Sequence, residues 1–147
     1  MSKTEMQRAT AAFVPDETTF AVRLNLETLK SFGCTYESGD ENQLKHLEKI
    51  ITSVKSSIAT ERQTFEPRFA IYASLADGDQ ITIVIHKSNS KFYAEIIQSA
   101  TSQKIHTLID SSLASEIYSL VRNFKLTPGG NLDSSNCAEF MEKISLE

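Results

Sequence analysis

Cysteine is scarce in this chain, and its two cysteines follow no functional spacing. Cys34 and Cys137 match no C-x-x-C pattern, so the sequence indicates neither a zinc site nor a thioredoxin-like redox motif. We expect both to be small, partly buried thiols in a reducing compartment. A chain of 147 residues can bury enough surface for one apolar core without a metal or a disulfide.

Long apolar runs are also missing. The densest stretch, Ile81 to Ile85, is short and contains Thr82, whereas a membrane-spanning helix needs about 20 apolar residues. Residues 1–20 carry several charges and no apolar run of seven or more, so we expect no secretory signal and a cytoplasmic protein. No membrane partner is expected.

Positive charge is not in excess. The 15 Lys and Arg side chains are outnumbered by 19 Asp and Glu, which gives a formal net charge of −4. Nucleic acids and anionic membrane surfaces are bound by clustered Lys and Arg. The composition therefore argues against both as partners.

Catalytic and metal-binding patterns are almost absent. His46, His86 and His106 form none of the H-x-H, H-x-x-x-H or H-E-x-x-H spacings, so we expect no metal and no cofactor. Glu95 beside His106, with Thr82 across from Glu95, is the one arrangement in which a carboxylate could orient an imidazole next to a hydroxyl. Cross-strand Glu and His pairs are commonly ordinary ion pairs. We therefore expect that the protein is not an enzyme.

The N-terminal part of the chain has a weak pattern. Residues 1–19 are rich in Thr, Ala and charge and predict a flexible arm, which leaves residues 20–147 as a single α+β domain. Alternating apolar residues suggest an extra strand over residues 20–25. One or two helical turns could follow, on Leu26, Leu29 and Phe32.

Three amphipathic helices are predicted, over residues 41–62, 112–124 and 136–145. Asp40 followed by Gln43 resembles a capping box at the start of the first. The apolar stripe of that helix consists of Leu44, Leu47, Ile50, Ile51, Val54 and Ile58.

Between the first two helices, residues 68–109 alternate apolar and polar side chains and predict a four-stranded antiparallel meander. Its loops set the register. A three-residue loop, Ala76–Gly78 with Gly78 in a left-handed conformation, pairs Ala73 with Ile81. A four-residue loop at Lys87–Ser90 pairs Ile85 with Phe92, and another at Ser99–Ser102 pairs Ile96 with Ile105.

One face of this sheet would carry the isoleucines and pack against the helices, which makes a two-layer α+β sandwich. The other face would be unusually apolar and aromatic for a wet surface, as in the core and rim of a protein interface. The predicted partner-binding centre is Tyr72, Val84, Tyr93, Ile97 and Leu108, with a polar rim of Arg68, Glu95, His106 and Lys91.

The predicted order of helix, four-strand meander, helix and helix is similar to that of the RWD class of interaction domains, which implies protein contacts without a catalytic centre. The resemblance covers residues 40–146. Asp110-Ser111-Ser112 stand where that class has a Y-P-x-x-x-P motif, so no residue role is transferred. Small acidic secretion chaperones and toxin-neutralising immunity proteins are similar in size, charge and composition.

These patterns favour a non-catalytic protein-binding module. It would mask or neutralise a partner, as an immunity protein, inhibitor, secretion chaperone or adaptor does, through the apolar sheet face or an edge strand. The partner would be another protein or a second copy of the chain. Two alternatives remain open: the segment Phe20–Leu26 or the arm before it covers that face, or the chain is a small enzyme or ligand-binding domain with a pocket between sheet and helices.

Overall fold

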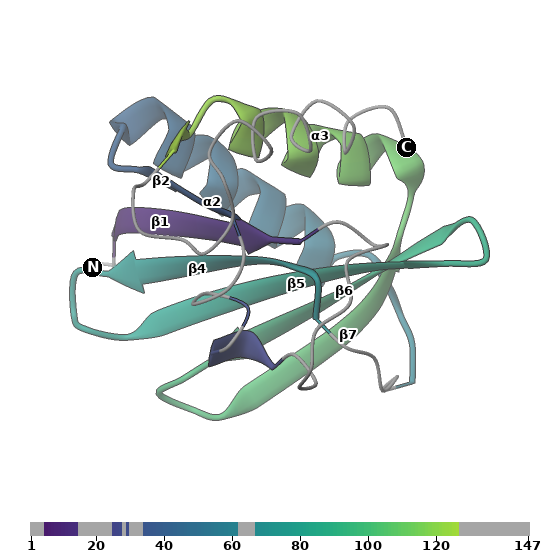
Figure 1. Cartoon of the computed structure of the whole chain (residues 1–147). Helices are drawn as coiled ribbons and strands as arrows, with labels where there is room; N and C mark the ends of the chain where they lie inside the picture. The colour runs from purple at the N-terminus through teal and green to yellow at the C-terminus, as the bar shows by residue number, and fades with distance from the viewer. Residues whose placement is uncertain (1–4, 15–24, 28, 30–33, 62–66, 127–147) are drawn as a thin grey trace.

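The computed structural model describes residues 5–14, 25–27, 29, 34–61 and 67–126. Within them the chain forms one antiparallel sheet and two long helices (Figure 1). The helices are α2 (Glu41–Lys55) and α3 (Ser111–Arg122). The strands are β1 (Met6–Phe13), β2 (Cys34–Ser38), β3 (Ile58–Ala59), β4 (Phe69–Leu75), β5 (Gln80–Ser88), β6 (Lys91–Gln98), β7 (Gln103–Ile109) and β8 (Lys125–Leu126).

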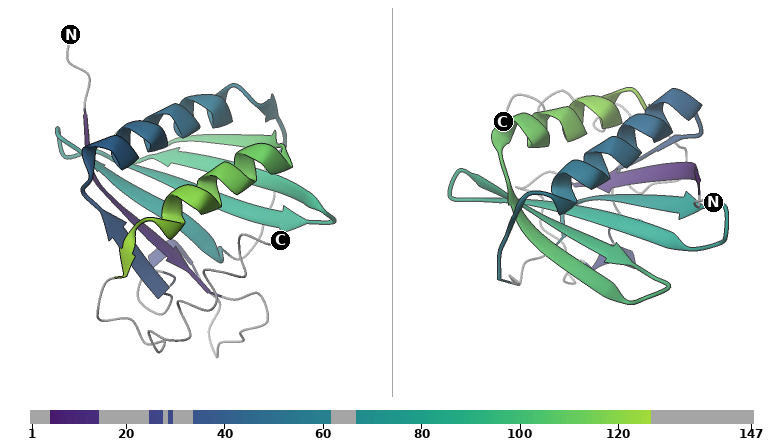
Figure 2. Two further views of the ribbon diagram at one scale, coloured as in Figure 1. Left: turned by 90° about the horizontal axis from the view of Figure 1, so that it is seen from above. Right: turned by 180° about the vertical axis from the view of Figure 1, so that it is seen from behind.

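The sheet has eight strands in the order β3-β7-β6-β5-β4-β1-β2-β8, and the two edge strands have two residues each. Both α2 and α3 lie on the same face, side by side across the strands, as Figure 2 shows. We call that face the inner face and the opposite one the outer face. The architecture is therefore α+β, with a helical layer on one side of an antiparallel sheet.

The predicted fold class, an antiparallel sheet with helices packed on one face, is correct. The predicted numbers of strands and helices are wrong. The four-stranded meander over residues 68–109 is confirmed as β4 to β7, but it is half of a larger sheet. The described residues hold two packed helices where three were predicted. The predicted helix over residues 136–145 and most of the predicted strand over residues 20–25 lie outside the described residues.

The prediction of a flexible arm over residues 1–19 is wrong for Met6–Phe13. These residues form β1, which lies inside the sheet between β2 and β4. Ala9 and Ala11 are fully buried on the inner face. Alanine has a low strand propensity and adds little to an apolar alternation, so β1 carries a weak sequence signal. With β1 and β2 ahead of α2, the element order also differs from the RWD-like order.

Two of the three predicted hairpin registers are confirmed. Ala73 pairs with Ile81 across a turn in which Gly78 has a φ of 92°, a conformation that glycine adopts without steric strain. Ile96 pairs with Ile105 across the loop at residues 99–102. In both hairpins the loop length set the register, as the sequence predicted.

The register between β5 and β6 was predicted wrongly. The strands run on to a two-residue turn, Asn89-Ser90, in which both residues have positive φ. Ile85 therefore pairs with Ala94 and not with Phe92, a shift of two residues that leaves every side chain on its predicted face. Glycine usually marks such a turn, and its absence hides the turn in the sequence.

Helix α2 begins at the predicted cap. Asp40 accepts a hydrogen bond from the backbone N–H of Gln43 at 2.9 Å, as an N-cap residue does. The hydroxyl of Ser38 donates to the side chain of Gln43 and accepts from the backbone N–H of Asp40. The helix ends at Lys55, earlier than predicted, so Ile58 leaves the helical stripe and enters β3.

The main core fills the space between the inner face and the two helices. Leu47, Ile50 and Val54 of α2 and Ile117 of α3 are buried against Ile83 and its neighbours on the inner face. Across the helix pair, His46 Nε2 lies 2.7 Å from Glu116 Oε2. No helix in the described part of the chain is long and apolar enough to cross a membrane.

Thr107 departs from the apolar pattern of this core. Among the described side chains, its hydroxyl is the one buried polar atom without a hydrogen-bond partner, and it lies on the inner face of β7. Replacing Thr107 by Val is expected to raise the free energy of unfolding by about 1–2 kcal/mol, because an unpaired buried hydroxyl is removed at nearly constant volume. Urea denaturation would measure the change; a lower stability would show that the hydroxyl has a partner.

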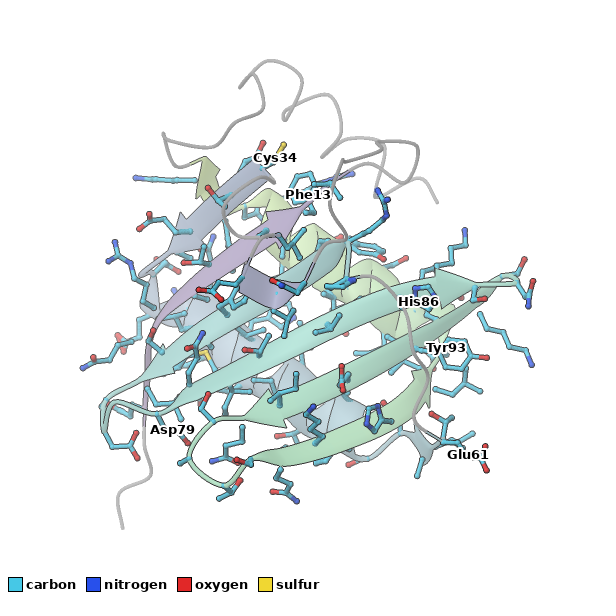
Figure 3. The ribbon with its side chains drawn as sticks, turned by 60° about the horizontal axis from the view of Figure 1, so that its bottom comes forward. Phe13, Cys34, Glu61, Asp79, His86 and Tyr93 are labelled. Atoms are coloured by element: carbon cyan, nitrogen blue, oxygen red, sulfur yellow. The ribbon has the colours of Figure 1, made fainter. Side chains whose placement is uncertain are left out.

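Asp79 joins two turns at one end of the meander, where Figure 3 labels it. Its carboxylate accepts hydrogen bonds from the side-chain amide of Gln98 at 3.0 Å and from the backbone N–H groups of Gln80 and Ala100, both at 2.8 Å. The Gln98 bond is the largest cause that lowers the pKa of Asp79 below its ordinary value, and the two backbone bonds add to it.

A lowered pKa makes Asp79 harder to protonate in the folded chain than in the unfolded chain. Its contribution to stability is therefore present above about pH 4 and lost as the pH falls through the folded value. Asp79→Asn is expected to lower the Tm at neutral pH and to flatten the acid limb of the Tm profile. Asp77→Asn, in the same turn, is the matched control, and an unchanged acid limb in Asp79→Asn would contradict the assignment.

Candidate functional site

The outer face carries every residue of the predicted partner-binding centre, since Tyr72, Val84, Tyr93, Ile97 and Leu108 all lie on the side of the sheet away from α2 and α3. The structure divides this set into two parts. Tyr72 and Val84 are buried within the chain, whereas the other three are partly exposed.

A short helical piece, of which residues 25–27 and 29 are described, covers the first part. Leu29 is fully buried and Leu26 partly buried against the outer face, and the Leu29 N–H bonds the Asn25 carbonyl at 2.8 Å. In Figure 1 this short dark-blue piece lies on the opposite side of the sheet from α2 and α3. A helical turn is therefore present where the sequence predicted one at Leu26 and Leu29. The cover differs from the intrachain alternative, since Met6–Phe13 of the arm lie inside the sheet and residues 20–24 lie outside the described residues.

A buried tyrosine, Tyr72, binds the helical turn to the sheet through a hydrogen bond. The hydroxyl of Tyr72 donates a hydrogen bond to the carbonyl of Leu26. Burial raises the pKa of Tyr72 above its ordinary value, because a phenolate would lose its hydration. The hydroxyl therefore remains a donor across the physiological pH range.

The second part of the outer face reaches the sheet edge. His86 on β5, Tyr93 on β6, Leu108 on β7 and Ile58 on β3 form one row of directly paired residues. Figure 3 shows His86 and Tyr93 on neighbouring strands of this face. Ile58 is 70% exposed, more than any other large apolar side chain in the described residues. The sequence predicts Ile58 as part of the buried apolar stripe of a helix, and it therefore gives no sign that Ile58 is a surface residue.

Glu95 and His106 face each other as predicted. The hydroxyl of Thr82, which was predicted across from Glu95, is not in that position. They are direct cross-strand partners, with His106 Nε2 3.6 Å from Glu95 Oε2, and both side chains are less than one-fifth exposed. Thr82 pairs with Ile97, and Val84 takes the place opposite Glu95. The arrangement is a cross-strand contact between a carboxylate and an imidazole, and Thr82 is not the cross-strand partner of either residue.

The remaining rim residues are spread along the same face. Lys91 begins β6 and is exposed, and Arg68, just before β4, is half-buried, with its carbonyl accepting the Val14 N–H at 3.0 Å. Lys104 adds a positive charge beside Ile97. Lys91 thus lies on the strand of Tyr93, two residues before it, whereas Lys104 lies beside Ile97 and not beside the row that contains Ile58.

Cys34 corrects a sequence interpretation. It begins β2, is buried opposite Phe13, and is disulfide-bonded, so the prediction of a free thiol is wrong here. The other cysteine of the sequence, Cys137, lies outside the described residues. Spacing alone gave no signal for this bond, because no sequence rule pairs two isolated cysteines.

Within the part of the chain that the structure describes, no three His, Cys, Asp or Glu side chains converge as a metal site would require. Comparison with known proteins gives no match: no protein-family model, no curated protein and no solved structure is similar to this chain at a significant level. The class that the geometry defines is therefore an α+β protein with an antiparallel sheet, and its function has to be argued from its own surface.

Proposed function

We propose that this chain is a non-catalytic protein-binding module that masks a partner through the open part of its outer face and the edge at β3. The observation that carries the proposal is the exposure of Ile58, 70%, in one row with Leu108 and Tyr93. A large apolar side chain exposed next to other apolar side chains is typical of an interaction site, and Tyr is enriched at such sites.

The edge adds a second means of contact. β3 pairs with β7 only at Leu108 and Thr107, and the Thr60 N–H bonds the His106 carbonyl at 3.0 Å. Very short edge strands are one way in which proteins limit pairing with another chain, but β3 covers β7 at these two residues alone. An extended partner segment could add to this edge and place its apolar side chains on Ile58.

The other function weighed from the sequence, a small enzyme or ligand-binding domain, rests on a pocket between sheet and helices or on Glu95 and His106. In the described residues the inner layer is filled by buried apolar side chains, and Glu95 and His106 lie on the outer face. No specific observation favours that function.

Site-specific photo-crosslinking tests the proposal. A benzophenone amino acid at position 58 is expected to capture a discrete protein in the native host, whereas the same probe at Lys49, exposed on α2 at the far side of the molecule, is not. A product with the mass of two chains would identify the partner as a second copy. Equal products from both positions, or none from position 58, would contradict the proposal.

The captured partner then allows a quantitative prediction. Ile58→Asp is expected to weaken its binding at least tenfold, about 1.4 kcal/mol or more, because a charge would be desolvated at an apolar contact. Lys49→Asp, which also changes charge, is expected to alter the Kd less than about twofold. Calorimetry on both folded variants decides between contact at Ile58 and a different surface.

A further inference from the structure

Strand β7 has an open stretch at the border of the sheet, the lower border in Figure 1. β3 pairs with β7 at Leu108 and Thr107, and the bond from the Thr60 N–H to the His106 carbonyl is the last one between the two strands. The first residues of β7, Gln103–Ile105, pair with β6 on one side. On the other side, none of the described residues pairs with them.

The main-chain groups of Lys104 point away from β6, beyond this border. Along a β-strand, the N–H and C=O groups of alternate residues point to the same side. The His106 carbonyl points to β3, where it accepts the Thr60 N–H, so the N–H and C=O of Lys104, two residues earlier in the same strand, point the same way. Lys104 therefore offers one donor and one acceptor to an added strand.

The side chains of this stretch determine what such a strand should carry. Lys104 is exposed on the outer face beside Ile97. Ile105 lies on the inner face, where it packs against the core and remains partly exposed. Directly opposed side chains of an antiparallel pair share a face and interact. An acidic partner residue is therefore favoured opposite Lys104, and an apolar one opposite Ile105.

A second copy of the chain does not fit this stretch. When Gln103–Ile105 pairs fully with itself in an antiparallel register, Lys104 lies opposite the same lysine of the copy, and like charges in that position are destabilising. Lysine on an edge strand hinders pairing of this kind. The charge of Lys104 therefore favours a different protein with a complementary charge.

We propose that Gln103–Ile105 is a strand-addition site for an extended segment of another protein, in which an apolar residue directly precedes an acidic one. The described strand pairs are antiparallel, and an antiparallel added strand with this order places its acidic side chain on Lys104 and its apolar side chain on Ile105. Main-chain bonds at Lys104 hold the strand, and the two side chains set its register. The inference rests on the proposed protein-binding function and adds the chemistry of the partner segment.

Hydrogen exchange on the wild-type chain tests whether the edge is open. The Lys104 amide is expected to exchange about a hundredfold or more faster than the Ile105 amide, because the Ile105 amide points to β6 and is protected by the strand pairing. Comparable protection of the two amides would show that the edge is already covered, and the proposal would be wrong.

A synthetic peptide of alternating Thr and Val, with one central Thr replaced by Glu, represents the partner segment. NMR titration of the full chain is expected to show saturable shifts centred on the Lys104 and Ile105 amides. The same peptide with Lys in place of Glu is expected to bind about threefold or more weaker, and Lys104→Glu is expected to reverse this preference. No binding at this stretch, or an unchanged preference in Lys104→Glu, overturns the proposal.

Two variants separate main-chain pairing from charge attraction. Lys104→Pro removes the outward N–H, which makes no bond to β6, and proline is tolerated at such edge positions. It is expected to abolish binding of the Glu peptide. Lys104→Ala keeps the N–H and is expected to weaken binding only about two- to fivefold. An equal loss in both folded variants would mean attraction without strand addition and would contradict the proposal.

Ile58→Asp is expected to leave binding of the Glu peptide unchanged, because Ile58 pairs with Leu108, at the other end of β7. Peptide binding at Lys104 without capture of a protein at position 58 would therefore contradict the proposed function and support the strand-addition site. Capture at position 58 without peptide binding at Lys104 would contradict the strand-addition site alone.

Discussion

Replacing Cys34 by Ser is expected to lower the free energy of unfolding by about 2–5 kcal/mol, the range found when a native disulfide is removed. The buried sulfur of Cys34 stands opposite Phe13 at the start of β2, and Phe13 stacks on Tyr36 and Phe69. The disulfide therefore acts at the junction of β1, β2 and β4. Urea denaturation of the wild type and the variant would measure the loss.

Reduction supplies the matched control. Adding a reductant is expected to destabilise the wild type by a similar amount and to leave Cys34→Ser unchanged, because the variant has no bond at this position to lose. Alkylation of the native, unreduced protein is expected to leave Cys34 unmodified. Ready alkylation of Cys34 without a reductant would contradict the disulfide and support the free thiol that the sequence predicted.

The redox state of Cys34 also bears on where the protein functions. Stable disulfides are rare in the reducing cytosol and common in oxidising compartments. The cytoplasmic location predicted from residues 1–20 therefore conflicts with a lasting disulfide at Cys34. Alkylation of the protein inside intact cells, before any oxidation during lysis, distinguishes the two.

The second large effect concerns the two faces of the sheet. Ile83→Ala is expected to destabilise the chain by about 2–5 kcal/mol, since Ile83 is fully buried on the inner face and its truncation leaves a cavity. The same change at Ile58, 70% exposed, is expected to alter stability by less than about 0.5 kcal/mol. Chemical denaturation of both variants measures the difference.

Because both substitutions change Ile to Ala, the difference between their losses of stability reflects only the surroundings of the two side chains. Similar losses at Ile83 and Ile58 would mean that β3 is packed into the core, and the open edge would be absent. A small loss at Ile83 would mean that this side chain is not buried in the core between sheet and helices. Either result would remove the basis for the proposed contact surface.

The meander could be predicted from sequence because its residues alternate strictly and its turns carry recognisable signals. Gly78 has a positive φ and fixed the first register, and Asp40 capped α2 as expected. The isoleucines at positions 81, 83 and 85 point to the inner face, as the alternation indicated. In these elements the local pattern and the tertiary packing agree.

The rest of the sheet could not be predicted, because its signals are weak or tertiary. β1 buries alanines, which do not distinguish a strand from a polar arm, and β2 reads as a polar connector although Cys34, Tyr36 and Ser38 are buried. The turn at Asn89-Ser90 lacks glycine. Each of these elements is defined by its neighbours in the sheet and not by its own sequence.

The candidate site was predicted in part for the same reason. Alternation placed Tyr72, Val84, Tyr93, Ile97 and Leu108 on one face, and the structure agrees. It could not show that Leu26 and Leu29 cover Tyr72 and Val84, nor that Ile58 extends the row at the edge. Both depend on contacts between residues far apart in the sequence.

Methyl NMR tests the assignment of the two faces most directly. With Ile, Leu and Val methyl groups labelled, Val84 is expected to show nuclear Overhauser contacts with Leu29, and Ile83 with Leu47 or Ile117 across the core. Contacts from Val84 to the α2 and α3 methyl groups, with Ile83 facing Leu29, would reverse the sheet and contradict the proposed binding surface on the outer face.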